Sequence, residues 1–145
     1  MTMFRFRLQK VLDLKEARER EVASQLARAM VAEQAARARL DDLQAVREAS
    51  ATGPEESRSV GELANLAFVL ECIDGHIATA NEAVAAAGAT VAQTQEALTI
   101  ASQGRRMLDR LRERHAETHR AVSEQSDRKT MDDVALVRYT QGGAS

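Results

Sequence analysis

A seam of mostly apolar residues runs from Leu63 to Ala101 and constrains this chain more than any other feature. Its members alternate in steps of three and four residues, so the mean period is about 3.5 residues, the repeat of a left-handed coiled coil. The seam predicts one long helix that packs against a partner helix. Its large apolar members are Leu63, Leu66, Leu70, Ile73, Ile77, Val84, Val91 and Leu98.

A second seam with the same spacing lies nearer the start of the chain. Residues 8–50 contain no Gly or Pro and consist mainly of Ala, Glu, Arg, Leu and Gln, which favours a first helix over this range. Charged residues occupy three seam positions, at Lys15, Glu19 and Glu33, and such intrusions weaken a coiled coil while they fix its register. The apolar seam includes Leu12, Val22, Leu26, Leu40 and Leu43.

A turn is predicted over residues 51–59, where the single proline, Pro54, follows Gly53. Ser59 and Glu62 have the spacing of a capping box, so we expect the second helix to span 60–139, with a disordered tail over 140–145. A short connection makes two helices antiparallel neighbours. The predicted fold is therefore all-α: a single-domain, elongated, antiparallel two-helix coiled-coil hairpin whose second helix is the longer one.

The register of the two helices is predicted by matching the seams. Folding the chain so that Leu43 lies opposite Leu70 places large residues opposite small ones through most of the pair. The same alignment places Glu33 opposite Ala80 and spares its charge a large aliphatic neighbour. In this register the N-terminal end of the first helix lies opposite Arg105 of the second helix. About a third of the second helix, beyond Arg105, therefore has no partner within the chain.

The composition narrows the classes of protein that the chain can belong to. With three Phe, one Tyr and no Trp among 145 residues, it lacks the large aromatic side chains that fill a compact core. A net charge of −2 argues against general binding to nucleic acid. The lone Cys72 can form no intrachain disulfide, and neither a secretory signal nor an integral membrane segment of ~18 apolar residues is evident, so we expect a cytoplasmic location.

Catalytic, cofactor-binding and metal-binding residues are not predicted. The glycines are scattered, and none belongs to a phosphate-binding loop followed by Lys and Ser or Thr. His115 and His119 lie four residues apart on one helical face, but Ala116 stands where a zinc-protease helix has Glu, and no third ligand is evident. We interpret the two histidines as exposed polar residues and the chain as a non-enzymatic protein without a cofactor.

Aromatic and basic residues gather where the chain begins and where the predicted pairing ends. Two interpretations stay open for the phenylalanines: packing onto the neighbouring helix, or docking to another protein. Three stay open for the arginines: solvated helix flanks, a footprint for an acidic protein surface, or a contact with nucleic acid, for which no aromatic platform accompanies them. The residues concerned are Phe4, Arg5, Phe6 and Arg7, together with Arg105, Arg106, Arg110, Arg112 and Arg114.

Two short motifs carry a resemblance to a known family. The opening Phe-Arg-Phe-Arg-Leu at residues 4–8 and the late Arg-Lys-Thr-Met-Asp-Asp at residues 128–133 resemble the flagellar FliJ family, and length and helix plan extend the similarity over nearly the whole chain. The resemblance implies a component of the flagellar type III export apparatus that is similar to the central stalk of rotary ATPases. It implies three partners, namely the flagellar export ATPase hexamer, the membrane export gate protein and export chaperones, and a peripheral position at the basal body on the inner membrane.

On this basis the nine aromatic and basic residues named above are expected to contact the ATPase ring, and the free chain is expected to be a monomer. The main alternative is a self-associating coiled-coil scaffold in which Leu108, Leu111 and Val122 of two chains bury one another. An adaptor of a related secretion system is a further alternative.

Overall fold

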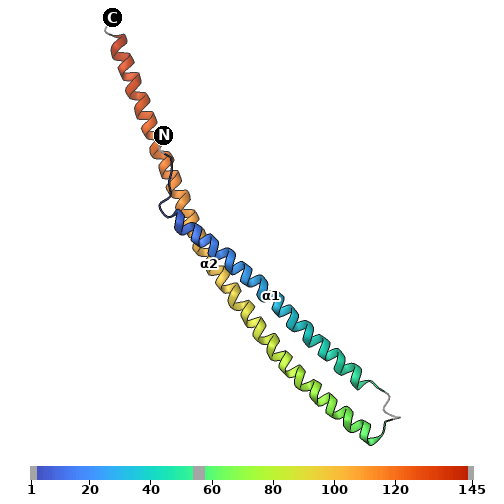
Figure 1. Ribbon diagram of the computed structural model, residues 1–145. Coiled ribbons are helices and arrows are strands. Elements are labelled where there is room, and N and C mark those ends of the chain that lie inside the picture. The colour runs from blue at the N-terminus through green and yellow to red at the C-terminus, as the bar shows by residue number, and fades with distance from the viewer. Residues whose placement is uncertain (1–2, 54–57, 144–145) are drawn as a thin grey trace. The chain divides into compact units, whose positions relative to one another are not determined.

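The structure, a computed structural model, describes residues 3–53 and 58–143 and contains two helices in this part of the chain. Helix α1 spans Gln9–Ala51 and helix α2 spans Val60–Gly142 (Figure 1). The predicted all-α hairpin with a longer second helix is confirmed. The chain divides into two compact units: unit 1 comprises Met1–Glu19 and Ala101–Ser145, and unit 2 comprises Arg20–Ile100.

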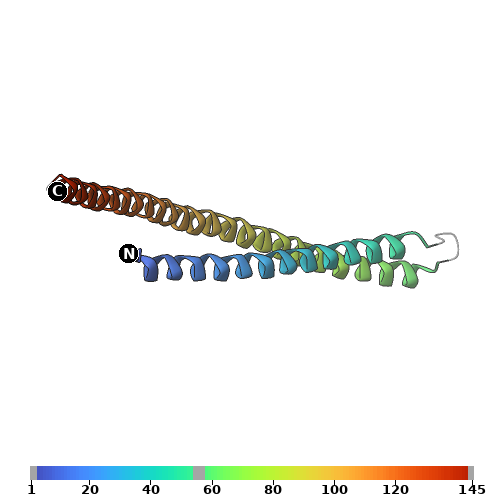
Figure 2. The same ribbon diagram turned by 90° about the horizontal axis from the view of Figure 1, so that it is seen from above.

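Within unit 2 the two helices lie side by side and run in opposite directions (Figures 1 and 2). Val22 is fully buried, and Ala80 and Val91 are buried opposite α1. Seam positions such as Leu26 and Leu40 are half-buried, whereas most of their neighbours on the same helix are exposed. Leu63 departs from this pattern because its side chain is 44% exposed. A two-helix pair has a single interface, so its core is this one row of side chains.

Helix α2 begins where the sequence predicts and ends later than predicted. The Ser59 hydroxyl accepts a hydrogen bond from the Glu62 N–H at 3.2 Å, and the Glu62 carboxylate accepts one from the Ser59 N–H at 3.2 Å. These two bonds confirm the predicted capping box, and α2 begins at Val60. At its other end α2 continues to Gly142, so residues 140–142, which we expected to be disordered, are helical. The proline of the predicted turn lies outside the described residues.

The predicted register is wrong by one heptad. In unit 2, Arg47 pairs with Asp74, and a Cβ added at Gly88 would lie 3.5 Å from Glu33 Oε1. In unit 1, Glu19 accepts a hydrogen bond from Ser102 Oγ at 3.1 Å, although we expected Glu19 opposite Thr94. Each contact places a residue of α1 eight positions further along α2 than predicted, which is about one heptad.

The physical reason for the different register lies in the charged seam residues of α1. Glu33 faces the bare backbone at Gly88, and Lys15 lies beside Gly104, where its Cδ and Nζ would be 3.9 Å from an added Cβ. Glu19 meets Ser102 and Arg105, which both donate to its carboxylate. Glu33 also pairs with Arg37 of its own helix at 2.7 Å, so it keeps this partner in any register, and Glu19 is the seam charge whose partners depend on the observed register.

The unpaired part of α2 is shorter than predicted because the register is shifted. The last half-exposed position of α2 is Ser123, and from residue 124 to residue 143 every side chain is exposed. This exposed stretch, called the overhang below, belongs to unit 1. It carries Met131, Val134 and Tyr139 in contact with solvent.

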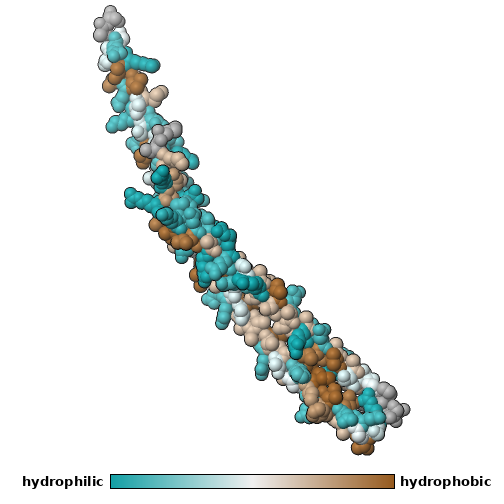
Figure 3. Space-filling view, viewed as in Figure 1, coloured by the Kyte–Doolittle hydropathy of each residue, from teal (hydrophilic) through white to brown (hydrophobic). Residues whose placement is uncertain are grey.

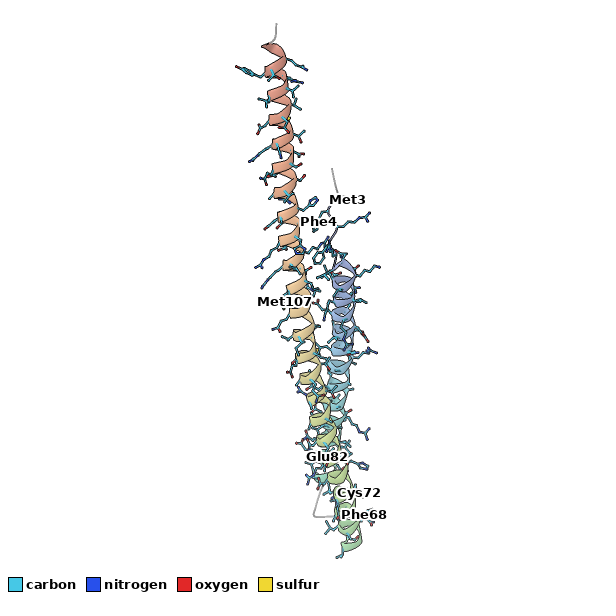
Figure 4. All side chains as sticks on the ribbon, turned by 90° about the vertical axis from the view of Figure 1, so that its left-hand side faces the viewer. Met3, Phe4, Phe68, Cys72, Glu82 and Met107 are labelled. Carbon is cyan, nitrogen blue, oxygen red and sulfur yellow. The ribbon has the colours of Figure 1, made fainter. Side chains whose placement is uncertain are left out.

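Unit 2 also carries exposed apolar side chains on the part of α2 nearest its first residue. Phe68 and Val69 are exposed there, as is Cys72, and Figure 4 shows Phe68 and Cys72 on this part of α2. The space-filling view shows brown, apolar surface in the same region (Figure 3). One 18-residue stretch of α2 has a mean hydropathy of 1.2 and meets the length and composition conditions for a membrane-spanning helix, which the sequence analysis did not expect.

Candidate functional site

The candidate site lies in unit 1, where the residues before α1 run along α2. Met3 to Phe6 have no regular secondary structure, and the Gln9 N–H donates to the Phe6 carbonyl at 3.0 Å as α1 begins. The Phe6 side chain is only 7% exposed, and its ring meets His115 edge-on with centroids 5.6 Å apart. Phe4 is half-buried and lies 5.6 Å from the ring of His119 in a tilted arrangement. Figure 4 shows Phe4 beside α2.

The two ring pairs form because two spacings agree. Alternate residues of an extended segment lie ~6.6 Å apart. Residues four apart on a helix are separated along its axis by ~6 Å. Phe4 and Phe6 therefore match His119 and His115. His115 is exposed, as expected, whereas His119 is half-buried, and the contacts of both rings with phenylalanines were not expected. Of the two interpretations left open for the phenylalanines, packing onto the neighbouring helix applies to Phe6.

A shallow groove of about 810 Å³ runs beside these rings. Met3 and Phe4 line it together with Arg5 and Arg7, whose side chains are exposed. Apolar contact surface and bidentate cationic donors thus lie next to each other, a combination that suits a protein surface with carboxylates. The residues that line the groove are Met3, Phe4, Arg5, Arg7, His115, Thr118 and His119.

Arg105, one of the predicted ring contacts, is engaged within the chain. It pairs with Glu19 of α1 and donates to Asp109 at 2.6 Å. Its side chain is 27% exposed and that of Glu19 is 23% exposed. Hydrogen bonding from Arg105 lowers the pKa of Glu19, burial opposes the shift, and the bond from Ser102 adds to it. The same bond from Arg105 to Glu19 raises the pKa of Arg105. The structure thus places Arg105 in the contact between the helices.

The other predicted arginines are exposed, and none of them forms an ion pair within the described residues. Arg106, Arg110 and Arg114 follow one another at four-residue spacing and so share one face of α2, called the arginine stripe below. Arg112 lies elsewhere, beside Phe4 and Gln9. The predicted set therefore separates into the stripe, a second group around the groove, and the internally paired Arg105.

Sequence reasoning missed the partners of these residues. Ser102 and Asp109 were not considered, although opposite charges at Glu19 and Arg105 were a signal available in the sequence. His115 and His119 were considered as metal ligands or as exposed polar residues, and their four-residue spacing was the signal for contact with two alternate phenylalanines.

The comparison with known families decides the class of protein. The family model described as "Flagellar FliJ protein" matches residues 3–144. The chain belongs to the flagellar FliJ family. No curated protein and no solved structure matches the chain significantly.

As a member of the FliJ family, the chain is a component of the bacterial flagellar protein export apparatus. The family consists of non-catalytic export components, and the helical coiled-coil-like fold agrees with this role. The match includes both the groove residues and the arginine stripe, since both lie between residues 3 and 119. Their role in partner binding stays a prediction.

Proposed function

We propose that this FliJ-family chain acts as a stalk-like subunit that engages the flagellar export ATPase ring and stimulates it. The contact would be made by unit 1, through the groove and the arginine stripe. The proposal extends to links with the membrane export gate and with export chaperones. It places the chain in the cytoplasm, peripherally associated with the basal body at the inner membrane.

The observation that carries this proposal is the cluster of exposed cations in unit 1. Arg5 and Arg7 flank the groove, and the three arginines of the stripe are exposed on α2. These side chains form no ion pair with any described residue, although Arg106 lies near enough to Glu19 to add to the lowering of its pKa by Arg105, and their guanidinium groups are available for bidentate contacts with carboxylates of another protein. Arg105 is removed from the proposed contact set because Glu19 and Asp109 already engage it.

The proposal is tested by reversing the charge of the stripe. The triple variant Arg106→Glu, Arg110→Glu, Arg114→Glu is expected to lose stimulation of ATP hydrolysis by the export ATPase of the same bacterium. The side chains are exposed, so the helicity measured by circular dichroism should stay unchanged.

A matched control reverses two exposed arginines of unit 2, Arg28→Glu and Arg39→Glu, which should leave the stimulation intact. The result that contradicts the proposal is full stimulation by the stripe variant. Equal loss in the control would show that net charge, rather than the stripe, determines the effect.

A self-associating scaffold is the second candidate, and the exposed overhang favours it. Met131, Val134 and Val137 are exposed on the overhang, and Val122, one of the residues expected to bury against a second chain, is 61% exposed. Leu108 and Leu111, however, are half-buried within the chain itself, which leaves less seam for a second copy. Sedimentation over a wide concentration range separates the candidates, because a scaffold grows in mass with concentration and a stalk stays monomeric.

A further inference from the structure

The apolar seams alone accept more than one register. A heptad pattern superimposes on itself when one helix slides by seven residues, so similar large-to-small layers recur. The offset given by the pairs Arg47 with Asp74 and Glu33 with Gly88 sets Leu40 opposite the region of Ala80, and one heptad away Leu40 would lie opposite Ile73. Val84 and Val91 likewise keep apolar neighbours in both registers. Apolar packing therefore discriminates poorly between the two arrangements.

The charged seam residues of α1 do discriminate. In the observed register Lys15 lies beside Gly104, Glu33 lies beside Gly88, and Glu19 is hydrogen-bonded to Ser102 and Arg105. One heptad away the same three residues would face Leu98, Ala80 and Thr94, none of which offers a countercharge. In the second register the half-buried Glu19 would lose both of its donors, which is unfavourable. Glu33 keeps its ion pair with Arg37 of the same helix in either register and exchanges Gly88 for the Ala80 side chain, and the exposed Lys15 exchanges Gly104 for Leu98. The loss at Glu19 is therefore the main cost of the second register.

We propose that Lys15, Glu19 and Glu33 act as a register lock, which holds the hairpin one heptad away from a second register that its apolar seams also accept. On α2, three positions accommodate these charged residues and are called the seats of the lock below: Gly88, Gly104, and the pair Ser102 and Arg105. When a seat is filled or the charges are removed, α1 slides along α2 by ~10 Å, the length of seven helical residues. Movements of this kind are a known form of conformational switching.

Sliding would change the surface that unit 1 presents. In the second register Phe4 and Phe6 would leave His119 and His115 and lie about seven residues earlier on α2. The overhang would then gain one heptad of exposed helix. The lock thus sets the length of the unpaired part of α2, and this inference stands independently of the proposed function because it concerns contacts within the chain.

The test uses pairs of cysteines that report each register, in a Cys72→Ser background. Arg47→Cys with Asp74→Cys reports the observed register, because these two residues pair in the structure. Arg47→Cys with Ala67→Cys reports the second register, since position 67 lies one heptad before position 74. All three positions are exposed, so the substitutions leave the seam intact. Disulfide formation within one molecule is measured on dilute protein by non-reducing electrophoresis.

With the lock intact, only the pair at 47 and 74 should form a disulfide. With Lys15→Ala, Glu19→Ala and Glu33→Ala, the yield of the pair at 47 and 67 is expected to rise ~fivefold or more, as a shift of about one kcal/mol between two states implies. A yield for 47 and 67 that stays at background in the triple alanine chain overturns the proposal.

A single substitution in one seat provides a second test, in case the triple variant loses helicity. Gly88→Leu fills the seat of Glu33 and should raise the yield of the pair at 47 and 67. Gly75→Leu is the matched control, because a Cβ at Gly75 meets nothing within 4 Å, and it should leave the yield unchanged. Equal yields for the two leucine variants would contradict the lock.

Discussion

The carboxylate of Glu19, on the seam of α1, accepts a hydrogen bond from Ser102 Oγ at 3.1 Å and pairs with Arg105 of α2. Arg105 also donates to Asp109 at 2.6 Å, so one guanidinium bridges two carboxylates. A charge at a seam position is thereby satisfied within the contact between the helices. This small network is what distinguishes the observed alignment of unit 1 from the one expected from apolar packing alone.

Acid should weaken unit 1 through Glu19. Its pKa is lowered below the ordinary value of 4.5, chiefly by the hydrogen bond from Arg105, so the folded state holds the proton less tightly than the unfolded state. The stabilisation is therefore complete above about pH 4.5 and is lost as the pH falls through the lower pKa of the folded state. Thermal melts from pH 7 to pH 3 check this, and Glu19→Gln should flatten the decline. An identical decline in the Gln variant would contradict it.

Burial along α1 predicts a contrast between two leucines. Leu12 is fully buried, whereas Leu14 on the same helical turn is 70% exposed. Leu12→Ala should lower the free energy of unfolding by about 2–4 kcal/mol, because it removes apolar contacts and leaves a cavity. Leu14→Ala should change it by less than about 0.5 kcal/mol. Urea denaturation measures both, and a larger loss for Leu14→Ala than for Leu12→Ala would be inconsistent with the seam.

The segment before α1 should contribute to stability mainly through one ring. Phe6→Ala removes a nearly buried side chain from its contact with His115 and should lower the free energy of unfolding by about 2 kcal/mol. Met3→Ala, at a position 85% exposed, is the matched control and should have little effect. Chemical denaturation checks the difference. Equal stability of the two variants would mean that the Phe6 ring does not hold the segment on α2 in solution.

Gly75 offers a stabilising substitution. It lies inside α2, and an added Cβ would meet nothing within 4 Å. Gly75→Ala should therefore raise the free energy of unfolding by about 0.5–1 kcal/mol, since alanine loses less conformational entropy in a helix. Differential scanning calorimetry measures the shift in Tm. A lower Tm would indicate that Gly75 has a role that the contacts within the chain do not reveal.

Local and periodic features of this chain could be predicted from the sequence. Helix α1 lacks Gly and Pro, the capping box of Ser59 and Glu62 marks the start of α2, and seam residues such as Leu12 and Val22 are buried. The register could not be obtained from the apolar residues because a heptad pattern repeats under a seven-residue shift. An ion pair between Glu19 and Arg105, considered together with the apolar residues, would have indicated the observed register.

The candidate site was predicted only in part. The location of the aromatic and basic residues in unit 1 was expected, but the contacts of Phe6 with His115 and of Arg105 with Glu19 were not. Both contacts depend on the register, and an error of one heptad moves each partner by ~10 Å. For this reason Arg105 was counted among the predicted binding residues, although in the structure it pairs with Glu19 and Asp109.

The proposed engagement of the export ATPase by this FliJ-family chain, as a stalk, is tested most directly by the mass of the complex. Native mass spectrometry of the chain mixed with the export ATPase and a nonhydrolysable nucleotide should detect one copy of the chain per ATPase hexamer. The variant with glutamate at all three positions of the arginine stripe should give hexamers without the chain. Several copies per hexamer, or the same complex with the stripe variant, would contradict the account.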